Sequence, residues 1–136
     1  MSRLRFLAVA LAFSAVACGK DTATTTTPTT TTATVTDTFA GTLTANGAAS
    51  YSFTTATSGN VTATIASLTP DSTLIVGLGL GTWNGNACQI VLAKDQATQF
   101  SYVVGQASSA GSLCVRIYDV GRVIDPTTYE VQVNHP

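Results

Sequence analysis

Three cysteines and one histidine are the side chains best suited to chemistry in this chain of 136 residues. Cys88 and Cys114 have no histidine neighbours and lack the spacing of metal ligands. His135 is the penultimate residue, where chain ends fray, so we expect an exposed tail residue and not a catalytic base. The glycine-rich run 77–81 lies in an apolar segment with no helix or lysine after it, which excludes a phosphate loop. The sequence therefore predicts a protein that is not an enzyme.

Cys18 stands at the end of a long apolar run. Two arginines precede residues 6–17, which carry no charge. The run is shorter than the roughly 20 residues of a membrane-spanning helix and is typical of a signal peptide. Its end, Ala15-Val16-Ala17-Cys18, resembles a bacterial lipobox, with Ala15 where leucine is usual. The resemblance implies that residues 1–17 are removed and that Cys18 carries the lipid. The alternative is an ordinary signal peptide cut at an Ala-x-Ala-like site, with an incidental thiol at position 18.

The resemblance to lipoproteins also implies a location. Two or three acyl chains on Cys18 would anchor the protein firmly to a membrane. Gly19 follows the cysteine, whereas aspartate at that position favours retention in the inner membrane of enterobacteria. We therefore expect an exported protein that is lipid-anchored in the cell envelope, at the outer membrane.

Cys88 and Cys114 are predicted to form a disulfide. With Cys18 lipidated, they remain as an even pair in a chain exported to an oxidising compartment. They lie 26 residues apart, and a bridge over such a loop contributes roughly 3–4 kcal/mol to stability. Two buried free thiols are the alternative. A redox role is disfavoured, because the spacing is not Cys-x-x-Cys and Arg116 is the one cation nearby in sequence.

Composition excludes one class of partner and indicates a tether. Removal of residues 1–17 leaves four Lys or Arg against seven Asp or Glu, a net charge of −3. No basic patch remains to neutralise phosphates, so nucleic acid is not an expected partner. Residues 22–36 contain eleven threonines and Pro28, which predicts an extended linker over residues 18–36 that holds a domain clear of the lipid headgroups.

From residue 37 onward, apolar and polar side chains alternate with a period of two. Strands are predicted around residues 39–43, 51–53, 61–65, 74–80, 88–92, 100–104, 113–117 and 129–133. Phe100, Tyr102 and Val104 define the sixth of these strands. Gly77 and Gly79 leave one face of the fourth strand thin, which indicates close approach of another layer or a bulge. Eight short strands without helical periodicity predict an all-β fold, a small antiparallel β-sandwich over residues 37–136.

The same region resembles the bacterial pre-peptidase C-terminal (PPC) domain. The resemblance is carried by the order and spacing of a Gly-Thr-Leu strand at residues 41–43, a Tyr-x-Phe strand at 51–53 and a closing Tyr-x-Val-x-Val strand at 129–133. Leu113 stands where an aromatic residue is common. The resemblance implies a jelly-roll-like sandwich with a non-catalytic role, usually as an accessory to a secreted hydrolase. No hydrolase accompanies it in this chain, so that role does not transfer intact.

Some PPC-like domains bind calcium through acidic loop residues, and three aspartates of this chain fall in predicted turns. They are Asp71, Asp119 and Asp125. Calcium takes about six to eight oxygen ligands, and no dense run of Asp or Asn supplies them here. Isolated aspartates in turns commonly bond to their own backbone instead. Calcium is the one cofactor that the sequence leaves open, with no assigned metal site.

A second possible ligand face surrounds the single tryptophan. Trp83 could form a stacking platform, with hydrogen-bonding amides from Asn84, Asn86 and Gln89. A lone tryptophan in a small sandwich also fits a core position. We expect a lipid-anchored envelope protein that presents a non-catalytic β-sandwich for structural or protein-interaction purposes. A carbohydrate-binding or calcium-binding accessory module is the alternative. The expected partners are the membrane, through Cys18, and an envelope protein or glycan.

Overall fold

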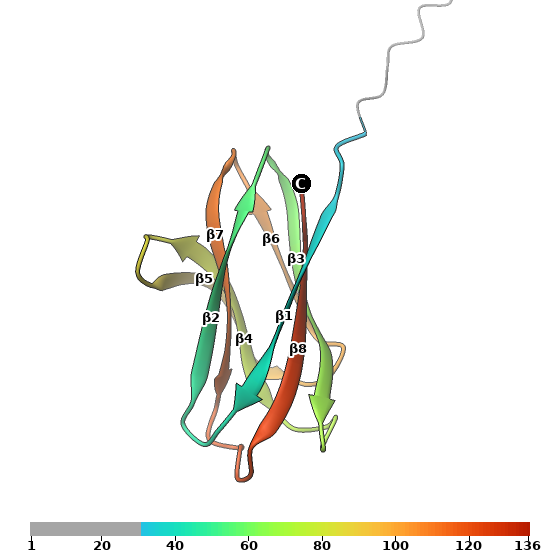
Figure 1. Ribbon diagram of the computed structural model, residues 1–136, viewed down its shortest axis with the longest axis vertical. Coiled ribbons are helices and arrows are strands. Elements are labelled where there is room, and N and C mark those ends of the chain that lie inside the picture. The colour runs from blue at the N-terminus through green and yellow to red at the C-terminus, as the bar shows by residue number, and fades with distance from the viewer. Residues whose placement is uncertain (1–30) are drawn as a thin grey trace, which may run out of the picture. The chain divides into compact units, whose positions relative to one another are not determined.

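The computed structural model describes residues 31–136, which form a sandwich of antiparallel strands (Figure 1). The strands are β1 (Val35–Leu43), β2 (Ala48–Thr55), β3 (Gly59–Thr69), β4 (Val76–Trp83), β5 (Cys88–Ala97), β6 (Tyr102–Ala107), β7 (Gly111–Asp119) and β8 (Thr127–His135). Over residues 31–136 the structure contains no helix, and hence none long and apolar enough to cross a membrane. The predicted all-β sandwich of eight strands is confirmed.

Two four-stranded sheets make up the sandwich. One has the order β1-β8-β3-β6 and the other the order β2-β7-β4-β5. Every connection except the β4–β5 hairpin passes from one sheet to the other. This double Greek-key arrangement of eight strands is the jelly roll. It leaves β1 and β6 at the edges of the first sheet, and β2 and β5 at the edges of the second.

The core lies between the sheets and follows from the period-two pattern. In β8, and in β3 as far as Ile65, every second residue is buried, as alternation across a strand requires. The largest fully buried side chains are Leu43, Ile65, Leu78, Ile117, Val61, Val76, Val115, Val131, Val133 and Cys114. Because β-branched residues dominate this set, the core suits a pleated sheet better than a helix.

Strand β4 is buried on both faces, and its glycines explain how. Val76, Leu78 and Leu80 point into the core. A Cβ on Gly77 would lie 2.1 Å from the Tyr118 ring, and one on Gly81 would lie 1.9 Å from the backbone oxygen of Gln89. The β4–β5 register shifts between Leu80 and Gly81. A bulge is therefore present, and the close contacts come from the neighbouring strands β7 and β5 of the same sheet and not from another layer.

The sixth strand differs from its prediction. Strand β6 begins at Tyr102, and Phe100 lies before it in a turn with φ of 67°. The buried residues of β6 are Val103 and Ala107, whereas Tyr102 and Val104 are exposed. The segment is apolar on both of its faces, so alternation alone could not tell which face packs inward. The first strand also begins earlier than expected, because Val35 and Thr36 pair with His135 and Asn134.

The chain enters and leaves the sandwich at the same end. Val35 is the register partner of His135, and Pro136 lies beside the start of β1 (Figure 1). The turns between β1 and β2 and between β3 and β4 lie at the opposite end, together with those between β5 and β6 and between β7 and β8. These four turns therefore lie at the end of the sandwich that is far from Val35.

Candidate functional site

A disulfide joins Cys88 to Cys114, as the sequence predicts. Cys114 lies on β7 opposite Gly81 of β4, and Cys88 begins β5 on the far side of β4. The two Cα atoms are only 5.6 Å apart, although β4 separates their strands in the sheet. The bulge at Gly81 and the absence of a side chain there allow β5 to fold over β4. The bond fastens this edge strand to the middle of its sheet.

The possible ligand face lies on the β4–β5 hairpin. Trp83 ends β4 and is half-buried, so it is not a core residue, and Asn84, Asn86 and Gln89 are exposed around it. The Asn84 side-chain oxygen accepts hydrogen bonds from the backbone N–H groups of Asn86 (3.0 Å) and Ala87 (2.8 Å). That oxygen shapes the turn, which leaves the Asn84 amide nitrogen and the other two amides for a ligand. All four residues lie on this hairpin. Trp83 pairs with Cys88, and Gln89 pairs with Thr82, so the side chains of Trp83 and Gln89 lie on opposite faces of the hairpin.

The three aspartates considered for calcium do not come together. No group of three acidic, histidine or cysteine side chains within residues 31–136 could hold a metal ion. Asp71 accepts from the backbone N–H (2.8 Å) and hydroxyl (2.7 Å) of Thr73, and the hydroxyl contact lowers the pKa of Asp71 most. Asp125 is exposed, and its backbone carbonyl accepts from the Thr127 hydroxyl at 3.2 Å. These residues shape their own turns, so they supply no common ligand set.

Asp119 is the most heavily bonded carboxylate of the described residues. Its oxygens accept four backbone N–H groups at 2.8–3.0 Å, from Asn46, Gly121, Arg122 and Val123. These bonds, the one from Val123 first, lower the pKa of Asp119 to about 2. The carboxylate joins the β7–β8 loop to the turn after β1. These four hydrogen bonds give Asp119 a structural role within the fold.

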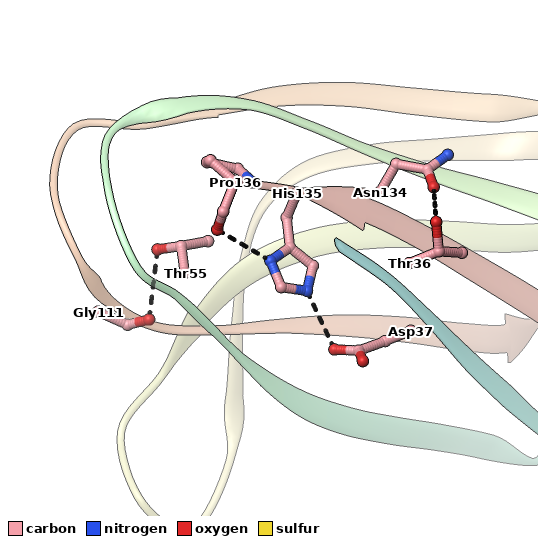
Figure 2. Close-up of polar contacts among 7 residues, drawn as sticks. All are labelled: Thr36, Asp37, Thr55, Gly111, Asn134, His135 and Pro136. Carbon is pink, nitrogen blue, oxygen red and sulfur yellow. Dashed lines mark hydrogen bonds and ion pairs between the residues drawn. The ribbon is translucent and has the colours of Figure 1, made fainter. Parts of the chain in front are cut away.

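His135 is buried, so the prediction of an exposed tail residue is wrong. Only 3% of its surface is accessible. Its Nε2 atom lies 3.0 Å from the Asp37 carboxylate and its Nδ1 atom 3.3 Å from the Pro136 carbonyl oxygen (Figure 2). The ring also packs on Phe53, with centroids 5.0 Å apart. The last strand pairs with β1 up to His135, and this pairing holds the chain end that we expected to fray.

A tyrosine–aspartate contact crosses the outer face of the second sheet. The Tyr118 hydroxyl donates to the Asp95 carboxylate, and its ring lies over Gly77. Burial, and then this hydrogen bond, raises the pKa of Tyr118 to about 12. The contact links β7 to β5 across β4, as the disulfide does. Its role is therefore to hold the edge strand β5 in place.

The side of the sandwich where β5 and β6 meet is apolar and uncovered; we call it the open side. Its exposed residues include Val91 (70%), Tyr102 (59%) and Val104 (50%). A cleft of about 170 Å³ lies between the sheets here, lined by Val61, Leu80, Gly81, Thr82, Val91, Leu92, Gly105, Gln106 and Leu113. The sequence did not predict this surface, because strand order, and not local pattern, decides which strands lie at the edges of a sheet. The uncharged segment from Tyr102 to Ala107 is the one local signal for it.

Cys18 lies outside the described residues, so its surroundings play no part in this site. Searches against protein-family models and against curated proteins found no match to this chain. The site is therefore interpreted from its own geometry.

Proposed function

We propose that this protein is a lipid-anchored protein of the bacterial cell envelope whose β-sandwich contacts other macromolecules and catalyses no reaction. One observation carries the proposal. The chain has three cysteines, and the Cys88–Cys114 disulfide accounts for two of them. The remaining one, Cys18, ends the apolar run at Ala15-Val16-Ala17. A disulfide also supports export to an oxidising compartment, where lipoproteins of this kind are held.

The sandwich itself is proposed to be a PPC-like module. Its jelly-roll strand order is the arrangement that the resemblance implies, and the segments that carry the resemblance lie in β1, β2 and β8. The open side supports an interaction role, because its side chains are apolar and exposed over a stretch of two neighbouring strands. We place the anchored protein at the outer membrane, on the strength of Gly19.

The anchor is tested by replacing Cys18 with serine in the full chain, expressed in a bacterial host with labelled palmitate. We expect the variant to lose the label and to move from the membrane fraction to the soluble fraction, because it has no thiol to acylate. The control is the double variant Cys88→Ala/Cys114→Ala, which removes the other two thiols and should keep both label and membrane location. Membrane-bound, labelled Cys18→Ser protein would disprove the proposal.

A second candidate function is glycan binding at the β4–β5 hairpin. The observation that favours it is the half-buried Trp83 on the same hairpin as the exposed side chains of Asn84 and Asn86. Iodide should quench Trp83 fluorescence, and a bound oligosaccharide should shift its emission and protect it from iodide. A Trp83→Ala variant should lose binding on a glycan array, whereas a Tyr102→Ala variant on the open side should keep it. A chain that binds no glycan on the array removes this candidate.

A further inference from the structure

Strand β6 has one free backbone edge. It pairs with β3 alone, in an unbroken register from Tyr102 to Ala107. The Ile65 N–H donates to the Ser101 carbonyl at 3.0 Å, which marks a hydrogen-bonded position just before β6. Hydrogen-bonded and outward-facing residues alternate along an antiparallel pair. The N–H and C=O groups of Tyr102, Val104 and Gln106 therefore point away from β3, toward the open side.

The usual protection of an edge strand is absent from β6. Strand β5, the neighbouring edge, has register shifts and carries Lys94 and Asp95. Bulges and charges of this kind discourage pairing with another chain. Strand β6 has neither, and no proline, and its outer face presents the exposed side chains of Tyr102 and Val104. An uncharged, regular edge strand is a template for β-augmentation.

We propose that β6 pairs with β6 of a second copy of this chain, antiparallel, with Val104 opposite its own counterpart. In this register Tyr102 lies opposite Gln106 of the second copy. The free backbone groups of Tyr102, Val104 and Gln106 in one copy therefore face those of Gln106, Val104 and Tyr102 in the other. The ladder then forms about six new hydrogen bonds. The inference deepens the interaction role proposed above by naming a partner, and it does not depend on the lipid anchor.

Charge favours a second copy as the occupant. A twofold contact brings each residue near its own equivalent, so a charged strand would repel itself. The segment from Tyr102 to Ala107 carries no charge, although the domain as a whole is acidic. It also offers no charged group that would select an acidic or basic peptide. Next to the twofold axis, on the face that points into the sandwich, Val103 of one copy lies opposite Gly105 of the other. The Val103 side chain therefore meets a residue that has no side chain. This pairing covers the cleft at Gly105, where a Cβ would already lie 3.2 Å from Leu92.

Cysteine cross-linking in the full chain tests the register. Hydrogen-bonded partners have Cα atoms about 5.5 Å apart, within the range of a disulfide. Whole cells that express Val104→Cys should therefore yield covalent dimer after mild oxidation, about tenfold more than Ile124→Cys. Ile124 is the matched control because it is 88% exposed and lies in the β7–β8 loop.

Two further variants fix the direction of pairing. Tyr102→Cys alone should give no more dimer than the control, because its own counterpart lies roughly 13 Å along the ladder. Co-expression of Tyr102→Cys with Gln106→Cys should restore the cross-link. Dimer at the control level from Val104→Cys, or an equal yield from Tyr102→Cys alone, overturns the proposal, and so does an adduct with a different protein. Palmitate labelling of the same samples reports the anchor separately, so the two proposals can fail independently.

Discussion

On one side of the sandwich the edge strands β1 and β2 face each other, and on the other side β5 and β6 do. At the first side, Phe39 of β1 stacks on Tyr51 of β2 with ring centroids 4.8 Å apart. The Tyr51 hydroxyl lies 2.7 Å from that of Tyr129 and donates to the Ala40 carbonyl at 3.3 Å. We call this the closed side. At the open side, Val91, Tyr102 and Val104 are exposed, and β5 and β6 exchange no side-chain hydrogen bond within the described residues.

The edge strands on the two sides of the sandwich differ in how they are covered. On the closed side, side chains of the same chain cover the gap, and burial together with Tyr51 raises the pKa of Tyr129. On the open side, only β5 is secured, by the disulfide and by the Tyr118–Asp95 contact, and β6 is left for a partner. Stability should therefore depend on aromatic residues at the closed side, and on the disulfide at the open side.

Removal of the disulfide should have the largest effect. We expect the double variant Cys88→Ala/Cys114→Ala to lose about 3–4 kcal/mol of unfolding free energy, since the bridge closes a 26-residue separation. Urea unfolding followed by circular dichroism measures the loss. Reduction of the wild-type protein should shift its midpoint toward that of the double variant, whereas the double variant itself should not respond to reductant. Equal midpoints for wild type and double variant would contradict the role given to this bond.

A matched pair of tyrosine variants tests the comparison directly. Tyr51→Ala removes the stacking on Phe39 and leaves the hydroxyl of Tyr129 without its partner, at a cost of about 2–3 kcal/mol. Tyr102→Ala removes an exposed side chain and should change the unfolding free energy by less than about 0.5 kcal/mol. Both are measured by urea unfolding of protein dilute enough to be monomeric. Similar losses for the two variants would show that the sides do not differ as described.

Asp119→Ala should destabilise the fold less than removal of the disulfide or of the Tyr51 side chain, and its effect should depend on pH. Asp119→Ala leaves four backbone N–H groups without their acceptor and should cost about 1–2 kcal/mol, because the site is open to solvent. The folded pKa, about 2, lies below the ordinary value of 3.8. The ionised carboxylate therefore stabilises the fold above pH 4, and this contribution disappears as pH falls from about 4 to about 2. Unfolding curves over this range should converge for wild type and variant. A constant difference at every pH would exclude the carboxylate charge as the cause.

Much of the fold can be read from residue pattern. Alternation located eight strands, and the glycines of β4 indicated the bulge that the register shows. Cys88 and Cys114 could be paired because exclusion of Cys18 left two. These features are local, or they follow from counting residues. They do not require knowledge of which strands are neighbours.

What the sequence could not supply depends on strand order. Val103 and Val104 are equally apolar, and only the position of β3 decides which of them is buried. His135 is held because β8 pairs with β1, a contact between residues 98 apart in the chain. The free edge of β6, and hence the candidate interaction surface, likewise appears only once the two sheets are assembled. The aspartates in turns were recognised, but their bonding partners could not be assigned.

The β1–β8 ladder has a mechanical consequence. Nine residue pairs join the two strands, from Val35↔His135 to Leu43↔Thr127. A pull on the residues before Val35, resisted by a partner at the opposite end of the sandwich, would draw β1 lengthwise past β8 and load these bonds together, in shear. A pull between Val35 and Pro136 would instead peel the strands apart one pair at a time. Because forced unfolding follows the height of the unfolding barrier, the domain should withstand the first kind of pull far better than the second.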